Sequence, residues 1–165
     1  MIRKDAAARA VPARRRPRVP VFAAARGAPT GGDMIFMRFF PNEKINEKLK
    51  AVCKKHKIET AVVISGIGQL KNVELGYFKE KGNYSSEYFQ GPFELLSLNG
   101  NICKQGGEYL LHLHTVLGTG KKKTIGGHLI SGIVEVTNEI VLLKTNIKLK
   151  RKLDNKTGLK TLFFE

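Results

Sequence analysis

Three of the four histidines of this chain fall close together, with a spacing typical of a metal site. His112 and His114 are two residues apart, so on a β-strand their side chains would point to the same face. His128 follows a Gly-Gly pair a short distance along the chain. Three neutral imidazoles can fill three corners of a zinc tetrahedron and leave the fourth position open. The sequence therefore predicts a zinc site at His112, His114 and His128.

A hairpin turn between these histidines would bring them together. The segment 118–123 is rich in glycine and lysine, as hairpin turns often are. If the flanking strands pair around Lys121, then His114 and His128, each seven positions from that lysine, lie opposite each other. A slip of one residue would turn His128 to the other face of the sheet. In the symmetric register, the hairpin places all three imidazoles on one face.

An open metal position admits two kinds of chemistry. A zinc-bound water with its pKa lowered to about 7 can act as a hydrolytic nucleophile, or the metal can bind an anion or a partner's side chain. Alternatively, the histidines are core or interface residues bonded to the backbone, or they have another catalytic role. No catalytic acid or base can be assigned, because Glu74, Glu94 and Glu108 are candidates only by their nearness to the motifs. The enzyme hypothesis is therefore the weaker one.

Short strands and one helix must position these histidines. The apolar and aromatic segment Met34–Phe40 ends at Pro41 and predicts a first strand closed by a turn. Asn42 is the predicted N-cap of an amphipathic helix that ends near His56. The apolar residues of this helix recur at helical spacing, at Ile45, Leu49, Val52 and Cys53.

The rest of the chain alternates apolar runs with glycine and asparagine turn signals. Ser65-Gly66-Ile67-Gly68 is predicted to end one strand in a bulge or turn. The expected strands are Ala61–Ile64, Val73–Phe78, Phe93–Ile102, Tyr109–Leu117, Ile125–Val136 and Ile140–Lys150. The predicted fold class is α/β (α+β), a largely antiparallel β-sheet with a helix after the first strand.

The composition fits one small folded domain. The chain has 165 residues, of which 42% are hydrophobic, enough for a single core. No apolar run approaches the ~18 residues of a membrane-spanning helix, so we expect no membrane partner. Cys53 and Cys103 show no CxxC spacing, and free thiols in the reducing cytoplasm are expected.

The net charge of +15 is divided between two segments of different composition. Residues 1–33 hold seven of the nine arginines, whereas residues 34–165 hold nineteen of the twenty lysines. We expect 1–33 to be a disordered or non-native tail, with an organelle transit peptide as the alternative, and 34–165 to be the folded domain. Arg14-Arg15-Arg16-Pro17-Arg18 resembles an AT-hook but lacks its glycine, which leaves non-specific phosphate attraction.

The predicted turn between the histidines is basic. Lys121, Lys122 and Lys123 are the candidate nucleic-acid contacts of the folded domain, since clustered lysines attract phosphates. Exposed lysines on a turn also serve as ordinary solubility charge. The sequence leaves both roles open.

Several motifs together resemble the plant-and-prokaryote-conserved (PPC) domain. They are Ser65-Gly66-Ile67-Gly68, Gly91-Pro92-Phe93-Glu94-Leu95-Leu96-Ser97-Leu98-Asn99-Gly100, His112-Leu113-His114, Gly126-Gly127-His128-Leu129 and the closing Asp154-x-x-Thr157-Gly158. The resemblance covers nearly all of 34–165 and implies an α/β fold with a largely antiparallel sheet, assembled as a homotrimer. The family's histidine motif falls on His112, His114 and His128. Pro92 stands where plant members carry arginine, which indicates the stand-alone prokaryotic type.

The resemblance implies a function for the chain. Plant members are nuclear DNA-binding proteins in which the domain follows AT-hooks, and prokaryotic members carry the label of DNA-binding proteins. We therefore expect a cytoplasmic homotrimer that acts as a binding or regulatory module, associates with DNA and carries a three-histidine zinc site. Its small-molecule ligand is not indicated. The alternative is a metal-dependent enzyme that uses a zinc-bound water.

Overall fold

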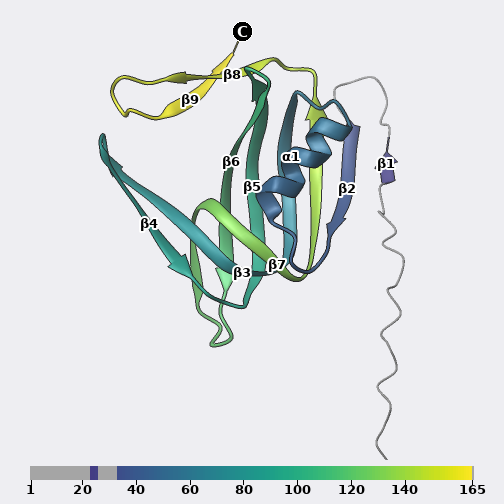
Figure 1. Ribbon diagram of the computed structural model, residues 1–165, viewed down its shortest axis with the longest axis vertical. Helices are drawn as coiled ribbons and strands as arrows, with labels where there is room; N and C mark the ends of the chain where they lie inside the picture. The colour runs from purple at the N-terminus through teal and green to yellow at the C-terminus, as the bar shows by residue number, and fades with distance from the viewer. Residues whose placement is uncertain (1–22, 26–32, 165) are drawn as a thin grey trace, which may run out of the picture.

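The computed structural model describes residues 23–25 and 33–164, which form nine β-strands and one α-helix (Figure 1). The elements are β1 (Ala23–Ala25), β2 (Asp33–Phe39), α1 (Ile45–Lys55), β3 (Thr60–Glu80), β4 (Asn83–Phe89), β5 (Phe93–Gln105), β6 (Glu108–Gly118), β7 (Thr124–Thr145), β8 (Leu149–Leu153) and β9 (Lys160–Phe164). A sheet-dominated fold with a helix after the first long strand agrees with the predicted fold class.

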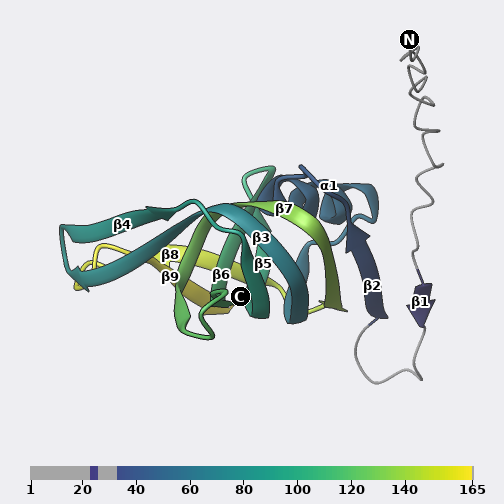
Figure 2. The same cartoon turned by 90° about the horizontal axis from the view of Figure 1, so that it is seen from below.

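Seven strands form one sheet in the order β1-β2-β7-β6-β5-β3-β4, and every pairing is antiparallel. The long strands β3 and β7 also pair with each other, so β3, β5, β6 and β7 close into a ring. β4 follows the outer end of β3, and the two project from the ring as an arm (Figures 1 and 2). β8 and β9 form a separate hairpin on the same side as that arm.

The helix covers the core with the face that its periodicity predicts. Ile45, Leu49, Val52 and Cys53 of α1 are buried, and they pack with the inward-facing residues of the ring. The predicted N-cap is wrong, because the helix begins after Lys44. Asn42 has a φ of 67° and donates its backbone N–H to the Val134 carbonyl at 2.8 Å. This residue ties the turn before the helix to β7 instead of capping the helix.

Each of the two longest strands was expected as two shorter ones, and both expectations are wrong. β3 continues through Ser65–Gly68, where a bulge or turn was predicted to end the strand. The pairing of β3 with β7 shifts register there, but the strand does not end. Gly68 has a φ of 138°, and a Cβ there would collide with the Thr137 carbonyl. β7 likewise continues past Val136 to Thr145. The strands bend without ending, which allows the ring to close.

The C-terminal hairpin and the strand β4 were not expected. The predicted strand Ile140–Lys150 ends at Thr145, and β8 begins at Leu149 as part of a different sheet. β4 has exposed residues on both faces, so it lacks the alternating pattern that identifies a half-buried strand.

Most of the segment 1–33 lies outside the described residues, including the AT-hook-like run Arg14–Arg18. Of its described residues, Ala23–Ala25 pair with Met34–Phe36 of β2, and Asp33 is the first residue of β2. Both cysteines are buried free thiols, and burial raises the pKa of Cys53 to about 12. In the described part of the chain, no helix has the length and apolarity needed to cross a membrane.

Candidate metal centre

The β6–β7 hairpin has the register expected from its turn. His114 lies directly opposite His128, and Thr115 opposite Gly127. His112 lies two residues before His114 on the same face of β6, while Leu113 between them is buried in the core. The alternation of β6 therefore directs both of its histidines away from the core, toward His128.

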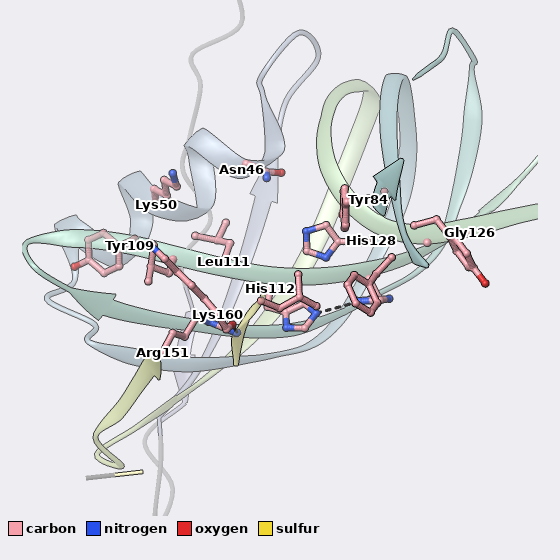
Figure 3. A pocket seen from close by; sticks show the side chains of 17 residues that line it. Asn46, Lys50, Tyr84, Tyr109, Leu111, His112, Gly126, His128, Arg151 and Lys160 are labelled. Atoms are coloured by element: carbon pink, nitrogen blue, oxygen red, sulfur yellow. Dashed lines mark hydrogen bonds between the residues drawn. The ribbon is translucent and has the colours of Figure 1, made fainter. Parts of the chain in front are cut away.

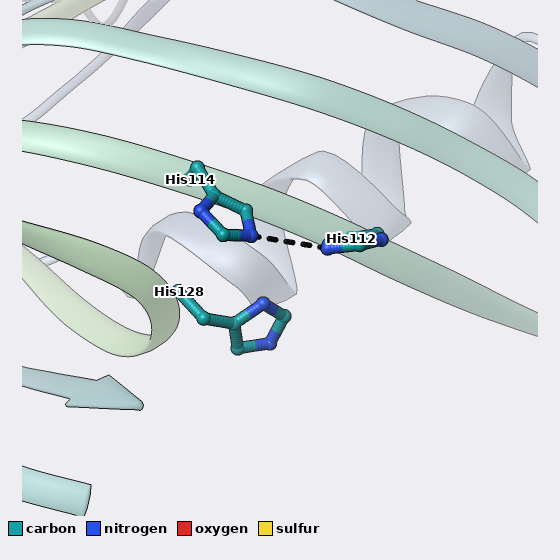
Figure 4. Close-up of side chains that lie close together, drawn as sticks. All are labelled: His112, His114 and His128. Carbon is teal, nitrogen blue, oxygen red and sulfur yellow. Dashed lines mark hydrogen bonds between the residues drawn. The ribbon is translucent and has the colours of Figure 1, made fainter. Parts of the chain in front are cut away.

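The three imidazoles form one compact cluster (Figure 4). Their ring centroids are 5.1 to 5.4 Å apart, and one ligand nitrogen from each ring lies within 4.8 Å of the others. The Nε2 atoms of His112 and His114 are 3.1 Å apart, at hydrogen-bonding distance. Zinc–nitrogen bonds of about 2.0–2.1 Å place tetrahedral ligand atoms roughly 3.4 Å apart. A small rotation of the side chains would bring the cluster to that spacing, so these residues fit a metal ion.

The surroundings of His112 and His128 favour the neutral form of these two imidazoles. Burial, followed by the positive charge of Arg151 and the neighbouring histidines, lowers the pKa of His112 from 6.5 to about 4. The pKa of His128 is lowered by burial, by His114 and by Arg151. Neutral imidazole is the form that binds a metal, so His112 and His128 can act as ligands at neutral pH without first losing a proton.

The cluster lies in a cavity of about 860 Å³ (Figure 3). Its walls come from five parts of the fold: the arm of β3 and β4, the first half of β6, the start of β7, the helix α1 and the β8–β9 hairpin. The lining residues are Asn46, Lys50, Gly76, Tyr77, Phe78, Tyr84, Tyr109, Leu110, Leu111, His112, His114, Gly126, Gly127, His128, Arg151, Leu159 and Lys160.

Tyr84 lies beside the cluster because Gly76, which is next to it in space, has no side chain. Gly76 of β3 is paired with His128, and a Cβ at Gly76 would collide with the Tyr84 hydroxyl. The Tyr84 ring meets the His128 ring edge-on, with centroids 6.4 Å apart. Burial and the charge of Glu74 raise the pKa of Tyr84. The phenol therefore stays protonated at neutral pH and can donate a hydrogen bond into the cavity.

Arg151 is a cavity residue that the sequence did not reveal. It stands in the basic run 148–152, which looks like solvated surface charge, yet it is 7% exposed. A signal was present, because residues 34–165 contain only two arginines, Arg38 and Arg151, among many lysines. Arginine in place of lysine is typical of a site that needs directed hydrogen bonds.

The other candidate residues lie outside the cavity. Lys121, Lys122 and Lys123 form the exposed β6–β7 turn, which the Thr119 hydroxyl closes by accepting from the Lys123 N–H and donating to its carbonyl. This turn and the β8–β9 hairpin lie at opposite ends of the molecule (Figure 1). Glu74, Glu94 and Glu108 do not line the cavity. The side-chain carboxylate of Glu94 instead accepts a hydrogen bond from Gln69.

Residues 26–146 match the family described as the Plants and Prokaryotes Conserved (PCC) domain. The chain belongs to this family. It is the plant-and-prokaryote-conserved domain that the motifs resemble, so that expectation is confirmed. The matched range contains all three cluster histidines and ends before β8.

Among solved structures, a plant- and prokaryote-conserved protein from Pyrococcus horikoshii is 33% identical, with a TM-score of 0.71 over 87% of this chain and 97% of that one. A candidate DNA-binding protein from Bacteroides thetaiotaomicron is 24% identical, with a TM-score of 0.76 over 87% and 97%. A metal-containing protein from Archaeoglobus fulgidus is 24% identical, with a TM-score of 0.73 over 88% and 99%. At 24% identity, the last two show the shared fold.

The curated relatives are much longer proteins. The bifunctional protein GlmU of Synechococcus sp. (strain JA-2-3B'a(2-13)) is 28% identical over 133 residues, which are 79% of this chain and 20% of that protein. A second Synechococcus GlmU matches with 28% identity over 83% of this chain and 21% of its own length. The chain thus spans about a fifth of the length of these relatives.

Proposed function

We propose that this PPC-domain chain is a cytoplasmic, homotrimeric binding or regulatory module that holds zinc at His112, His114 and His128 and associates with DNA. The convergence of three imidazoles, each with a ligand nitrogen within 4.8 Å of the others, carries the metal part of the proposal. The Archaeoglobus fulgidus neighbour, described as metal-containing, supports it. A bound divalent ion would supply positive charge and an open position for a ligand.

Calorimetric titration of the metal-free full chain with Zn²⁺ tests the metal site. We expect about one ion per chain, with protons released in proportion to the fraction of protonated ligands. Because the pKa of His112 is lowered to about 4, that histidine should release almost no proton at pH 7. A chain that binds no zinc, or several ions weakly, would contradict the proposal.

The trimer is supported by an apolar surface on the outer side of the sheet. Met34 and Phe36 of β2 and Val62 and Ile64 of β3 are 38% to 46% exposed, and we call them the outer apolar face. Met34 and Val62 are both paired with Leu143 of β7, so they lie in one row on one side of the sheet. Contiguous exposed apolar residues of this kind typically mark a protein interface.

The DNA part of the proposal is supported by charge. The chain carries a net charge of +15, and Lys121, Lys122 and Lys123 form an exposed basic turn. The Bacteroides thetaiotaomicron neighbour, described as a candidate DNA-binding protein, supports the same function. Electrostatic contacts of this kind bind phosphates without reading base sequence. The cytoplasmic location is proposed because both cysteines are free thiols, as is usual in a reducing compartment.

A binding module is favoured over a metal-dependent hydrolase by the cavity lining. The described residues that line the cavity include no aspartate or glutamate. A hydrolase normally positions a general base such as a carboxylate or histidine beside the reacting atoms, and here the histidines are engaged in the cluster. Metal-dependent turnover of an ester or phosphoester by the zinc-loaded chain, abolished in His112→Ala, would instead support the enzyme.

A further inference from the structure

A buried cation shares the cavity with the histidines. Arg151 is 7% exposed, and no carboxylate within the described ranges forms an ion pair with it. Its Nη1 donates to the Lys160 carbonyl at 3.1 Å, its Nη2 donates to Asn101 Oδ1, and its Nε is buried without an acceptor. Both acceptors are neutral. A buried guanidinium is stable only when negative charge or full hydrogen bonding compensates it, so a compensating group is missing here.

The whole cavity has the same charge imbalance. Lys50, Arg151 and Lys160 line it, and the described lining contains no acidic residue. The guanidinium of Arg151 lines the same cavity as the three histidines. A divalent ion on the histidines would increase this positive charge. The cavity is therefore suited to an anion, which would offset the repulsion between the metal and the guanidinium.

The β8–β9 hairpin holds Arg151 in place. Gln105 of β5 accepts from the Arg151 backbone N–H at 2.8 Å and donates to its carbonyl at 3.1 Å. At the tip of the hairpin, the Lys81 ammonium donates to the Asn155 carbonyl at 2.7 Å and ties the hairpin to the arm of β3 and β4. A cation fixed in this way loses little conformational freedom when a ligand binds.

The size and the lining of the cavity indicate a ligand that is larger than an inorganic ion. Its volume is about 860 Å³, within the range of sites for small organic ligands. Aromatic and aliphatic side chains line it away from the charges, at Tyr77, Phe78, Tyr84, Tyr109 and Leu111. Figure 3 shows Tyr84, Tyr109 and Leu111 around the same space as His112 and Arg151. An organic anion with an apolar body would match both parts of this lining.

We propose that the cavity binds a small organic oxyanion, a carboxylate or a phosphate ester with an apolar body, and that Arg151 and Lys160 hold its anionic group beside the histidine cluster. The inference deepens the proposed function and rests on it, because the metal would add to the attraction. Arg151 and Lys160 also attract an anion when no metal is bound, so the metal-free chain should prefer anions to neutral ligands as well.

The test is calorimetric binding of three probes to the full chain, zinc-loaded and metal-free. Benzoate and phenyl phosphate carry the two anionic groups on one aromatic body, and benzyl alcohol is the neutral control. We expect the zinc-loaded chain to bind at least one anion about tenfold or more tightly than benzyl alcohol, since charge-assisted hydrogen bonds are the stronger ones. The preferred anion identifies the ligand class. Equal binding of all three probes would overturn the proposal.

Single variants test how much the charges of Arg151 and Lys160 contribute to anion binding. Arg151→Gln and Lys160→Gln should each weaken anion binding, Arg151→Gln by about tenfold, with zinc content unchanged. Lys160→Gln keeps the hairpin contact, because Arg151 bonds to the backbone carbonyl of Lys160. Lys156→Gln removes the same charge from the same hairpin outside the cavity lining, and should leave binding unchanged.

The outcomes distinguish a failure of the anion-binding proposal from a failure of the proposed metal site. Unchanged anion affinity in both Arg151→Gln and Lys160→Gln overturns the inference and leaves the metal site standing. Equal losses in Lys156→Gln and Lys160→Gln also overturn it, because they indicate general charge attraction. A chain that takes up no zinc but prefers anions through Arg151 supports the inference while contradicting the metal site.

Discussion

His114 lies directly opposite His128 across the β6–β7 hairpin, with each residue seven positions from Lys121. This pairing, with His112 two residues along the same face, brings the three imidazoles together. Because a shift of one residue would turn His128 away, the register of this hairpin determines whether the cluster exists.

The acid stability of the metal-free chain should depend on His112. Its pKa is lowered from 6.5 to about 4 in the folded chain, so between these values the unfolded chain binds a proton that the folded chain does not. The free energy of unfolding therefore falls as pH falls through this window. His112 is partly exposed, so the effect should be on the order of 1 kcal/mol.

Urea denaturation at pH 7, 5.5 and 4 in the presence of chelator measures this dependence. His112→Asn should show a shallower loss of stability with acid than the wild-type chain. Equal pH dependence in the two proteins would mean that the folded structure does not lower the pKa of His112.

Gly68→Ala should destabilise the fold strongly. The residue has a φ of 138°, and the added Cβ would meet the backbone carbonyl of Thr137, which cannot move aside as a flexible side chain can. A loss of roughly 2–4 kcal/mol in unfolding free energy is expected. Gly132→Ala is the matched control, because its Cβ would meet only ordinary contacts at 3.5 to 3.7 Å. Similar thermal midpoints for both variants would argue against the bent course of β3.

Parts of this fold and site could be predicted from the sequence because their signals are local. The buried face of α1 follows from apolar residues at helical spacing, and the histidine register follows from a symmetric turn. The continuity of β3 through Gly68 could not be predicted, because it depends on a close approach to Thr137 from a strand far along the chain.

Arg151 could not be assigned to the site for a similar reason. Its neighbours in the sequence are lysines, and its burial results from the docking of the β8–β9 hairpin through Gln105 and Lys81. The sequence pattern of a hairpin does not show which surface it covers. Such long-range contacts become visible only when the fold is known.

Replacing the basic turn should reduce the salt dependence of DNA binding. Each phosphate contact contributes about 0.9 to the slope of log affinity against log salt, so the combined change of Lys121, Lys122 and Lys123 to Gln should lower the slope by up to about 3. Fluorescence anisotropy with a labelled duplex at several salt concentrations measures it. The combined change of Lys54, Lys57 and Lys156 to Gln removes the same charge elsewhere. Equal effects of the two triple variants would assign binding to overall charge.

A charge on the outer apolar face should dissociate the proposed trimer. The wild-type chain should elute with about three times the protomer mass of 18.3 kDa, and Val62→Asp should shift it to the single-chain mass. Light scattering coupled to size exclusion measures both. Leu153→Asp changes a residue that is 62% exposed but lies in the β8–β9 hairpin, and should leave the mass unchanged. A wild-type monomer would contradict the proposed assembly.

The zinc content of the full chain, purified without chelator, tests the central claim most directly. We predict about one zinc per chain in the wild type and in His56→Ala, which changes the histidine at the end of α1. His114→Ala should lose the metal, since only two imidazoles would remain. Elemental analysis of the three proteins gives the answer. Wild-type protein without zinc after zinc supplementation, or undiminished zinc in His114→Ala, would contradict the account.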